Sequence, residues 1–313
     1  LSWYRIDEYS RQGAPDASAT YTRAVQEKEI FPSRSIPPGY TPEITFDLTY
    51  YPREKGPYNY DIPGGIQAGA FRTAGVDNQN NLLEPQTRWA GIMSKLSTND
   101  FEAANVEYID FWLLNPFMQK YNQSPVTSDG NMYIQLGSFS EDIFKDGKQQ
   151  FENGLPTTSQ KVPTEQTVYG KISKFPPIVN GFDISERSKQ DIGYDGLNTF
   201  YAENEKDEKS FFKDYLDVLS QSLATDKYTL VAADPSNDDY VSYRDSKFQS
   251  NGATVLERYK RYNMPEGNGG TQESANAIAS TAYSLNPDQE DINSDKSLNE
   301  LESYFNYTIP LKK

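Results

Sequence analysis

The sequence predicts a mainly β protein, an antiparallel β-sandwich of jelly-roll type with a few added helices. Stretches in which apolar and polar residues alternate recur along the chain, and turn-forming Gly, Pro and Asn residues separate them. Few stretches have helical spacing, and these do not alternate with the strands as they would in a parallel βαβ fold. Strands that follow one another in this way favour antiparallel pairing.

Three strands are predicted in the first half of the chain, at residues 43–51, 104–114 and 132–139. The middle one, ANVEYIDFWLL, is apolar on both faces, which is typical of a central strand that is covered on both sides. We therefore expect Trp112 or its neighbour Phe111 to be buried in the core. An exposed contact surface is expected instead at the tyrosines that flank the turn at Gly56-Pro57, which are Tyr50, Tyr51, Tyr58 and Tyr60.

The remaining elements are mixed. Residues 140–154 resemble a short helix with Ser140 as its N-cap, and residues 205–223 have the apolar spacing of an amphipathic helix. The other predicted elements are strands at 167–175 and 227–233 and a final segment, 300–309, that passes from helix to strand.

Composition excludes several classes of function. The chain carries 45 acidic and 30 basic residues, a net charge of −15, which argues against nucleic acid as a partner. It has no Cys and no His, so thiolate chemistry, Ser–His triads and His-bound zinc are excluded. Most of the negative charge lies in the second half, which predicts a strand-rich sandwich domain at 1–181 and an acidic α+β extension packed on it at 182–313.

One acidic segment near the C-terminus has the spacing of a calcium-binding loop. Oxygen-bearing side chains stand at the loop positions that would wrap around Ca²⁺, with a final Glu that could bind through both oxygens. The candidate ligands are Asp291, Asn293, Asp295, Ser297 and Glu302. Lys296 stands where such loops usually have Gly, and Ser297 and Glu300 also fit a metal-free helix capping box, so both interpretations stay open.

A weaker candidate cation site lies at Asp191 and Asp195, where Gly196 suits the turn but two ligand positions lack side-chain oxygens. An Asp-Gly pair of this kind is also typical of an ordinary turn. The sequence shows no specific pattern of catalytic residues. The carboxylates Glu107 and Asp110 point to opposite faces of one predicted strand, so we expect no catalytic centre and no cofactor other than calcium.

Several stretches together resemble one family, among them LSWYRID, LTYYPREKGPYNYD, RWAGIMSKLSTNDFEAANVEYIDFWLLNPF and EDINSDKSLNELESYFNY. In this order they are similar to the SprA/Sov family, the outer-membrane translocon of the type IX secretion system of Bacteroidota. The resemblance implies export of folded cargo, including gliding adhesins, across the outer membrane to the cell surface. Family members are several times longer, so we expect this chain to be one part of such a protein.

What the resemblance implies for this part is narrower. Its helices, long loops and acidic second half favour an extramembrane structural and interaction domain over a section of the pore. The expected partners are other parts of the translocon, associated outer-membrane or periplasmic secretion proteins, and secreted cargo. A surface carbohydrate-binding sandwich is the alternative, and it would need exposed Trp or Tyr rings.

Overall fold

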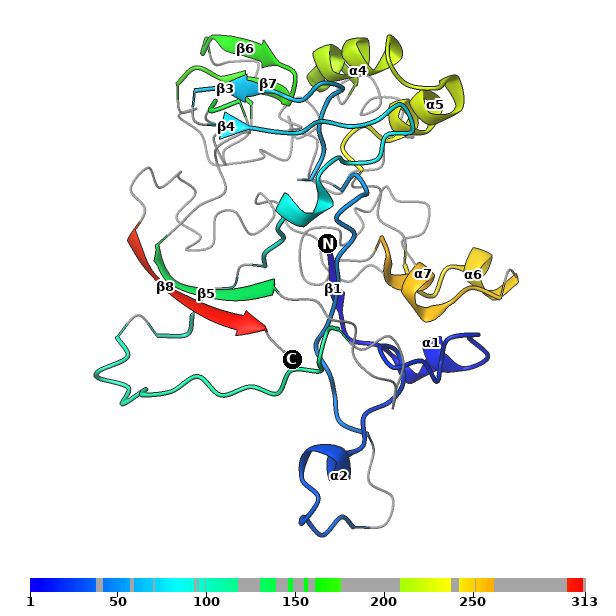
Figure 1. The fold of residues 1–313 in the computed structure, drawn as a ribbon, viewed down its shortest axis with the longest axis vertical. Coiled ribbons are helices and arrows are strands. Elements are labelled where there is room, and N and C mark those ends of the chain that lie inside the picture. Colours follow the sequence, from blue (N-terminus) through cyan, green and yellow to red (C-terminus); the bar gives the residue numbers. More distant parts are fainter. Residues whose placement is uncertain are drawn as a thin grey trace.

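The computed structural model describes most of the first half of the chain and separate parts of the second. The described residues are 1–37, 42–56, 59–69, 71–92, 94, 96–98, 100–117, 130–138, 146–148, 155–156, 161–175, 209–237, 242–250, 252–261 and 303–311. Within them, short helices and two-stranded antiparallel sheets are joined by long irregular segments (Figure 1).

Four antiparallel strand pairs are present in the described residues. They are β1 (Ser2–Tyr4) with β2 (Asp47–Thr49), β3 (Gln67–Ala68) with β4 (Phe71–Arg72), β5 (Gly130–Ser138) with β8 (Ser303–Leu311), and β6 (Thr164–Thr167) with β7 (Gly170–Ser173). The prediction of antiparallel strands with several helices is confirmed. The content is mixed α and β, however, and a jelly-roll sandwich is not confirmed, since no described sheet has more than two strands.

The helices are short, and some of them begin at a local capping signal. They are α1 (Glu8–Arg11), α2 (Glu27–Ile30), the 3-10 turn η1 (Pro85–Thr87), α4 (Lys213–Ser220), α5 (Thr225–Ala233), α6 (Ser246–Ser250) and α7 (Val255–Tyr259). A capping box opens α7: Thr254 Oγ1 accepts from the Glu257 amide at 3.1 Å, and the Thr254 amide donates to the Glu257 carboxylate at 2.8 Å.

Most of the elements predicted from periodicity are found. Strand 132–139 corresponds to β5, the amphipathic stretch 205–223 contains α4, and the end of the chain forms β8. The predicted strand 43–51 contains β2, and the predicted strand 167–175 contains β7, which pairs with β6 in a hairpin. The predicted helix 140–154 lies almost entirely outside the described residues.

One predicted strand is a helix. Residues 227–233, KYTLVAA, belong to α5. The prediction of a strand here is wrong, because it followed the β-branched residues of this stretch. Helical spacing is what the tertiary structure requires, because Val231 is buried in the core while Tyr228 and Ala232 pack against the same cluster. Packing therefore overrides the local β preference of Val and Thr in this segment.

The main core lies under α4, and aromatic side chains dominate it. Its fully buried rings are Phe211, Phe212, Tyr215, Tyr60 and Tyr169, which meet edge to face at centroid distances from 4.8 to 6.2 Å. Aliphatic residues from the irregular segments and from α4 and α5 complete the cluster, and they are Ile62, Val76, Leu82, Leu155, Leu216, Leu219 and Val231. Gly170 is required here, because an added Cβ would stand 2.1 Å from the Phe211 ring.

A second, smaller core joins the N-terminus to α7. Tyr4 stacks on Tyr259 at 4.3 Å, and Tyr259 stacks on Tyr243 at 4.8 Å. The Ser2 hydroxyl donates to the Lys260 carbonyl at 2.8 Å. Both cores bring residues from the first 181 positions against residues from the second part of the chain, and the predicted division at residue 181 stays a prediction.

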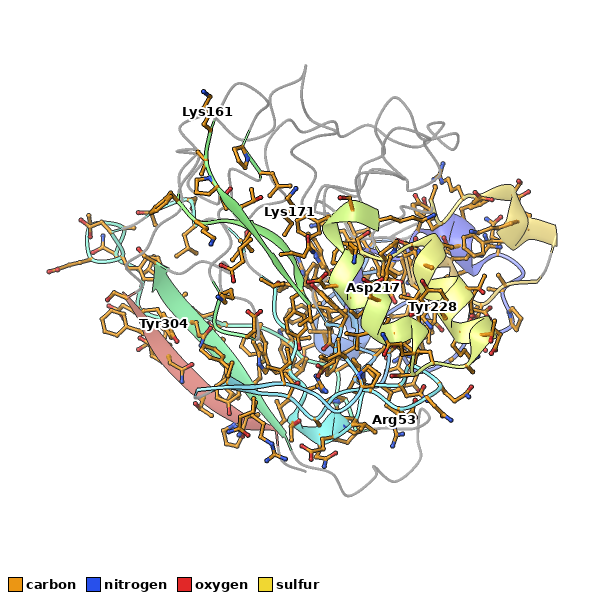
Figure 2. The ribbon with its side chains drawn as sticks, turned by 90° about the horizontal axis from the view of Figure 1, so that it is seen from above. Arg53, Lys161, Lys171, Asp217, Tyr228 and Tyr304 are labelled. Atoms are coloured by element: carbon orange, nitrogen blue, oxygen red, sulfur yellow. The ribbon has the colours of Figure 1, made fainter. Side chains whose placement is uncertain are left out.

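The β5–β8 pair lies apart from the α4–α5 helices in both views, with Tyr304 at its far end in the second (Figures 1 and 2). In its register, three apolar pairs share one face: Met132 with Ile309, Ile134 with Tyr307, and Leu136 with Phe305. The opposite face carries polar pairs such as Gln135 with Asn306, whose side chains are hydrogen-bonded at 3.3 Å. Tyr133 and Tyr304 also lie on this second face, so the pair has one apolar face and one mixed face.

The predicted central strand 104–114 is the largest departure. Residues 101–105 form turns, and residues 106–115 have no strand partner among the described residues. In Figure 1 this teal part of the chain runs as a long open trace outside the labelled elements. The prediction that Trp112 or Phe111 is buried is therefore wrong: Trp112 is 72% exposed and Phe111 46%. The covering layers that its apolar faces demand are missing from the described part of the chain.

Candidate functional site

A buried carboxylate, Asp61, organises the irregular segments beside the main core. It is fully shielded from solvent, and both of its oxygens accept hydrogen bonds. The donors are the Ile62 amide (2.9 Å), Thr73 Oγ1 (2.9 Å), Tyr169 Oη (2.9 Å), the Gly75 amide (3.1 Å) and Arg88 Nη2 (3.1 Å). These donors come from the loop 61–88 and from the β6–β7 hairpin, so one carboxylate ties two distant parts of the chain together.

The Asp61–Arg88 ion pair is buried on both sides, with 0% and 9% of the two side chains exposed. Arg88 also donates from Nε to the Leu83 carbonyl at 3.1 Å and from Nη2 to the Gly75 carbonyl at 3.3 Å. A buried charge is tolerated only when such partners replace its hydration shell. Because all of its acceptor sites are taken, Asp61 has no lone pair left to serve as a general base.

The negative charge of Asp61 acts on the tyrosines around it. Burial raises the pKa of Tyr169 far above its ordinary value, and the nearby Asp61 carboxylate raises it further. Burial raises the pKa of Tyr215 in the same way, again with a contribution from Asp61. Both hydroxyls stay protonated at any physiological pH, as suits a structural cluster.

Backbone geometry makes this cluster possible. Gly75 has a φ of +84°, and a Cβ at this position would stand 2.4 Å from the Gly65 nitrogen and 2.5 Å from the Ile62 carbonyl oxygen. Glycine alone combines that conformation with such close approach of two backbone segments. The Gly75 amide can therefore reach Asp61.

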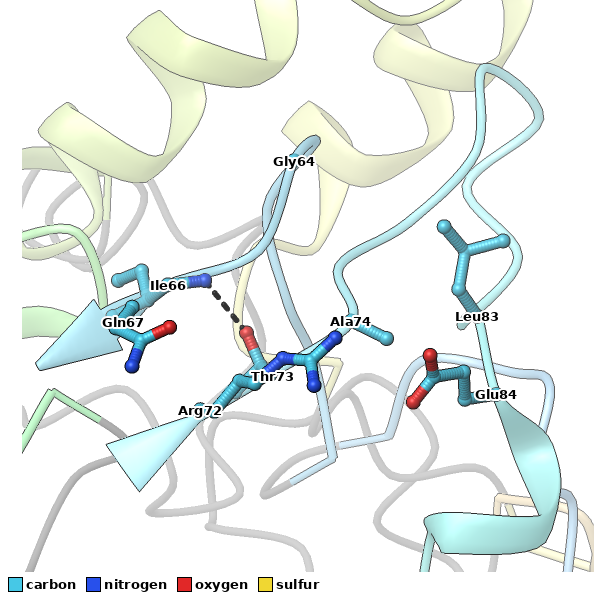
Figure 3. Close-up of a pocket in the computed structure, with 8 residues that line it drawn as sticks. All are labelled: Gly64, Ile66, Gln67, Arg72, Thr73, Ala74, Leu83 and Glu84. Atoms are coloured by element: carbon cyan, nitrogen blue, oxygen red, sulfur yellow. Dashed lines mark hydrogen bonds between the residues drawn. The ribbon is translucent and has the colours of Figure 1, made fainter. Parts of the chain in front are cut away.

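A shallow hollow of about 400 Å³ lies beside the cluster (Figure 3). The Ile66 amide donates to Thr73 Oγ1 at 2.8 Å along its floor. Figure 3 shows the side chains of Arg72 and Glu84 pointing toward one another across it. The lining has one cation and one anion with no group of acidic ligands, so it offers neither a catalytic set nor a metal site.

The exposed segment 106–114 is the second candidate feature. Its side chains Tyr108 and Trp112 are 79% and 72% exposed, and its other large apolar residues, Val106, Ile109, Phe111, Leu113 and Leu114, are between 42% and 51% exposed. A turn positions it: the Val106 amide donates to the Phe101 carbonyl at 2.9 Å, and Asn105 has a φ of +49°. Trp112 meets the Phe31 ring edge-on at 5.8 Å, which anchors the segment near α2.

A run of exposed large apolar side chains is uncommon on a monomeric protein and is typical of surfaces that contact another molecule. Among the described residues, it is the feature of the molecule best suited to contact another protein. Sequence reasoning found the segment itself but assigned it to the interior.

The predicted site residues have different outcomes. The candidate calcium ligands Asp291, Asn293, Asp295, Ser297 and Glu302, and the weaker pair Asp191 and Asp195, all lie outside the described residues. The described part of the chain holds no cluster of three or more potential metal ligands. The prediction that Tyr60 is exposed is wrong, because it is 3% exposed in the main core.

The Asp61 cluster was missed from the sequence. Its only local signal is an acidic residue between two apolar ones, Tyr60-Asp61-Ile62, followed by Pro-Gly-Gly. That pattern predicts a turn as readily as a buried charge. The partners that identify it, Arg88 and Tyr169, are distant in sequence.

None of the helices among the described residues has the length and apolar character needed to cross a bilayer. Residues 214–313 match the family model SprA_N, which is described as a motility related/secretion protein. No curated protein and no solved structure matches the chain. The match supports a role in secretion or motility, and its description is not that of an enzyme family. The resemblance of the chain to the SprA/Sov family is therefore confirmed, with residues 214–313 carrying the match.

Proposed function

We propose that this chain is an extramembrane structural and interaction part of the type IX secretion translocon, and that it supports export of folded cargo and gliding adhesins across the outer membrane. The observation that carries the proposal is the family match over 214–313. The exposed apolar segment 106–114 supports an interaction role, and the fully bonded Asp61 supports a structural one.

The partners in this proposal are other parts of the translocon, associated outer-membrane or periplasmic secretion proteins, and the cargo. The location is the outer membrane or the cell surface. The excess of acidic residues suits contact with basic protein surfaces more than with phosphate-bearing partners.

The proposal is tested by deleting the coding region for residues 1–313 in frame in a bacterium with a type IX system. We expect cargo to disappear from the cell surface and gliding to stop, while the rest of the parent protein is still detected in the outer membrane. A matched strain carrying Glu165→Gln, a change outside the exposed segment 106–114, controls for the genetic manipulation, since it should fold and secrete normally. Normal cargo secretion after the deletion would contradict the proposal.

A carbohydrate-binding module is the second candidate, because exposed aromatic rings are what sugar stacking requires. Trp89 is 79% exposed, as is Tyr108, and Trp112 is 72% exposed. Titration with a glycan panel tests it. Binding that is abolished by Trp112→Ala but kept by Tyr133→Ala, an exposed ring on β5, would favour the carbohydrate function.

We also propose a bound calcium ion at Asp291–Glu302, on the spacing of its oxygen ligands. Calcium at about 100 times its dissociation constant should stabilise the domain by about 2.7 kcal/mol. The thermal midpoint should therefore rise with calcium and fall with chelator in the native chain, and Glu302→Gln should abolish the difference. Ser297→Ala is the informative companion, since a destabilisation that is independent of calcium would leave only the capping box.

A further inference from the structure

The backbone of residues 107–114 is unpaired within the described structure. None of the backbone hydrogen bonds among the described residues, in strands or in loops, involves these positions. The last bond before them is the one from the Val106 amide to the Phe101 carbonyl, and the next is from the Phe117 amide to the Asn115 side chain at 2.9 Å. Eight consecutive residues thus present free donors and acceptors, which is the condition of an edge strand open to pairing.

The side chains of this segment limit what can cover it. In a strand, Tyr108 and Trp112 would lie on one face and Ile109, Phe111 and Leu113 on the other. A helix laid on the segment would cover one face and leave the backbone unpaired. A partner strand is the occupant that satisfies the backbone directly and extends a sheet whose layers can cover both faces.

Charge decides between the possible partner strands. From residue 96 to residue 117 the chain has four acidic residues and no basic one, and each face of the segment carries one carboxylate, Glu107 or Asp110. Both carboxylates are exposed. A second copy of this chain would bring another net charge of −15 to the contact, which opposes self-association. A basic partner is therefore favoured.

We propose that residues 106–114 bind as a β-strand along the open edge strand of a partner polypeptide in which apolar and basic side chains alternate. The inference rests on the proposed function, for which it names the contact that holds the interaction domain to its machinery. Hydrogen bonds between the backbones of the segment and the partner strand hold both in extended conformation. The carboxylates of Glu107 and Asp110 favour a partner strand with basic side chains.

The probe for the test is a blocked synthetic peptide of alternating valine and lysine, equal in length to the segment. Added to the whole chain, it should bind and slow hydrogen exchange at the amides of 107–114. A peptide with lysine replaced by glutamate should not bind. A valine–lysine peptide that is N-methylated at alternate residues should not bind either, because it keeps the charge but cannot pair its backbone.

Variants of the chain sharpen the assignment. The double variant Glu107→Lys/Asp110→Lys should bind the valine–lysine peptide about tenfold or more weakly, as expected when close charge pairs are reversed. Glu102→Lys is the matched control, an exposed carboxylate of the same stretch that lies outside the segment, and it should bind as the native chain does.

Four results would overturn the inference: equal binding of the N-methylated peptide, protection at the β5–β8 edges instead of 107–114, concentration-dependent dimerisation that protects 106–114, or protection of the segment by phosphatidylcholine vesicles alone. Dimerisation would mean that a second copy of the chain covers the segment, and protection by vesicles would mean that a membrane covers it.

The deletion experiment separates the two proposals. If the deletion blocks secretion but the valine–lysine peptide does not bind, only this inference is contradicted. If the peptide binds but secretion stays normal after the deletion, only the proposed function is contradicted.

Discussion

Tyr60 and Trp112 mark two aromatic regions of this protein with opposite environments. Tyr60 lies in the main core, where Tyr169, Phe212 and Tyr215 surround it edge to face and 3% of its surface is exposed. Trp112 lies in the exposed segment 106–114, where its one ring contact among the described residues is with Phe31. The sequence predicts the reverse, with Trp112 inside and the Tyr60 region outside.

The difference shows that an aromatic stretch alone does not determine burial. The rings of the core are covered because a buried carboxylate, Asp61, links the loop that carries Tyr60 to the hairpin that carries Tyr169. The exposed segment is more apolar but has no such link within the described chain. Apolar residues that find no layer to cover them remain available for another molecule.

The largest effect that separates the two regions is expected at Asp61. Asp61→Ala should lower the free energy of unfolding by about 3–5 kcal/mol, because it leaves the buried Arg88 without its counter-charge. Urea unfolding followed by circular dichroism measures this. Glu165→Gln is the control, since it removes an exposed carboxylate paired with Lys148 and should change stability far less. A small loss at Asp61 would mean that it does not hold the core together.

Removing a core ring should have a comparable or slightly smaller effect. Phe212→Ala should cost about 3–5 kcal/mol, since the ring is fully buried and its contacts with Phe211 and Tyr215 would be replaced by a cavity. The same unfolding measurement applies, with Phe212→Leu as the conservative control that keeps most of the volume. A neutral Phe212→Ala would show that this core is loosely packed.

A backbone change beside Asp61 should come next in size. Gly75→Ala forces a side chain into a conformation with positive φ and into contact with Gly65 and Ile62, which should cost about 1–3 kcal/mol or more. Gly56→Ala is the matched control, because its added Cβ meets nothing within 4 Å and should be neutral or slightly stabilising. Equal effects at both glycines would contradict the close approach at Gly75.

Alkaline pH should weaken the cores and leave the exposed segment unaffected. Burial raises the pKa of Tyr259 to about 12 from its ordinary value of 10.0. The unfolded chain then releases this proton more readily than the folded one, so the stabilisation is complete below pH 10 and is lost as pH rises toward 12. Unfolding curves across this range, with tyrosinate absorbance as a second readout, should show that loss, and Tyr259→Phe should reduce its slope. A slope that Tyr259→Phe leaves unchanged would contradict this assignment.

The smallest effect is expected at the exposed segment. Trp112→Ala should change the free energy of unfolding by no more than about 0.5 kcal/mol, because the ring is mostly in water. Urea unfolding monitored by circular dichroism avoids the loss of the tryptophan signal. A cost near that of Phe212→Ala would show that the segment is covered in solution and would remove the contrast between the two regions.

Elements with a strong period were predictable from sequence, and distant pairings were not. The alternation in 132–139 identified β5, and the spacing of Phe212, Tyr215 and Leu219 identified the α4 region. The pairing of β5 with β8, more than 160 residues later in the chain, was not visible, nor was the partnership of Asp61 with Arg88 and Tyr169. Helix α5 was mistaken for a strand because its packing, and not its propensity, sets its conformation.

The stacked tyrosines of the smaller core have a consequence for how the chain folds. Tyr4 contacts Tyr259 across a sequence separation of 255 residues, and Ser2 contacts Lys260 across 258. During synthesis or export, residues 2–4 therefore cannot complete these contacts until residues 259–260 have also emerged. Closing so long a loop costs conformational entropy, and the stabilising contacts between its ends form only after it has closed. Residues 2–4 should accordingly be among the last of the described parts to become native.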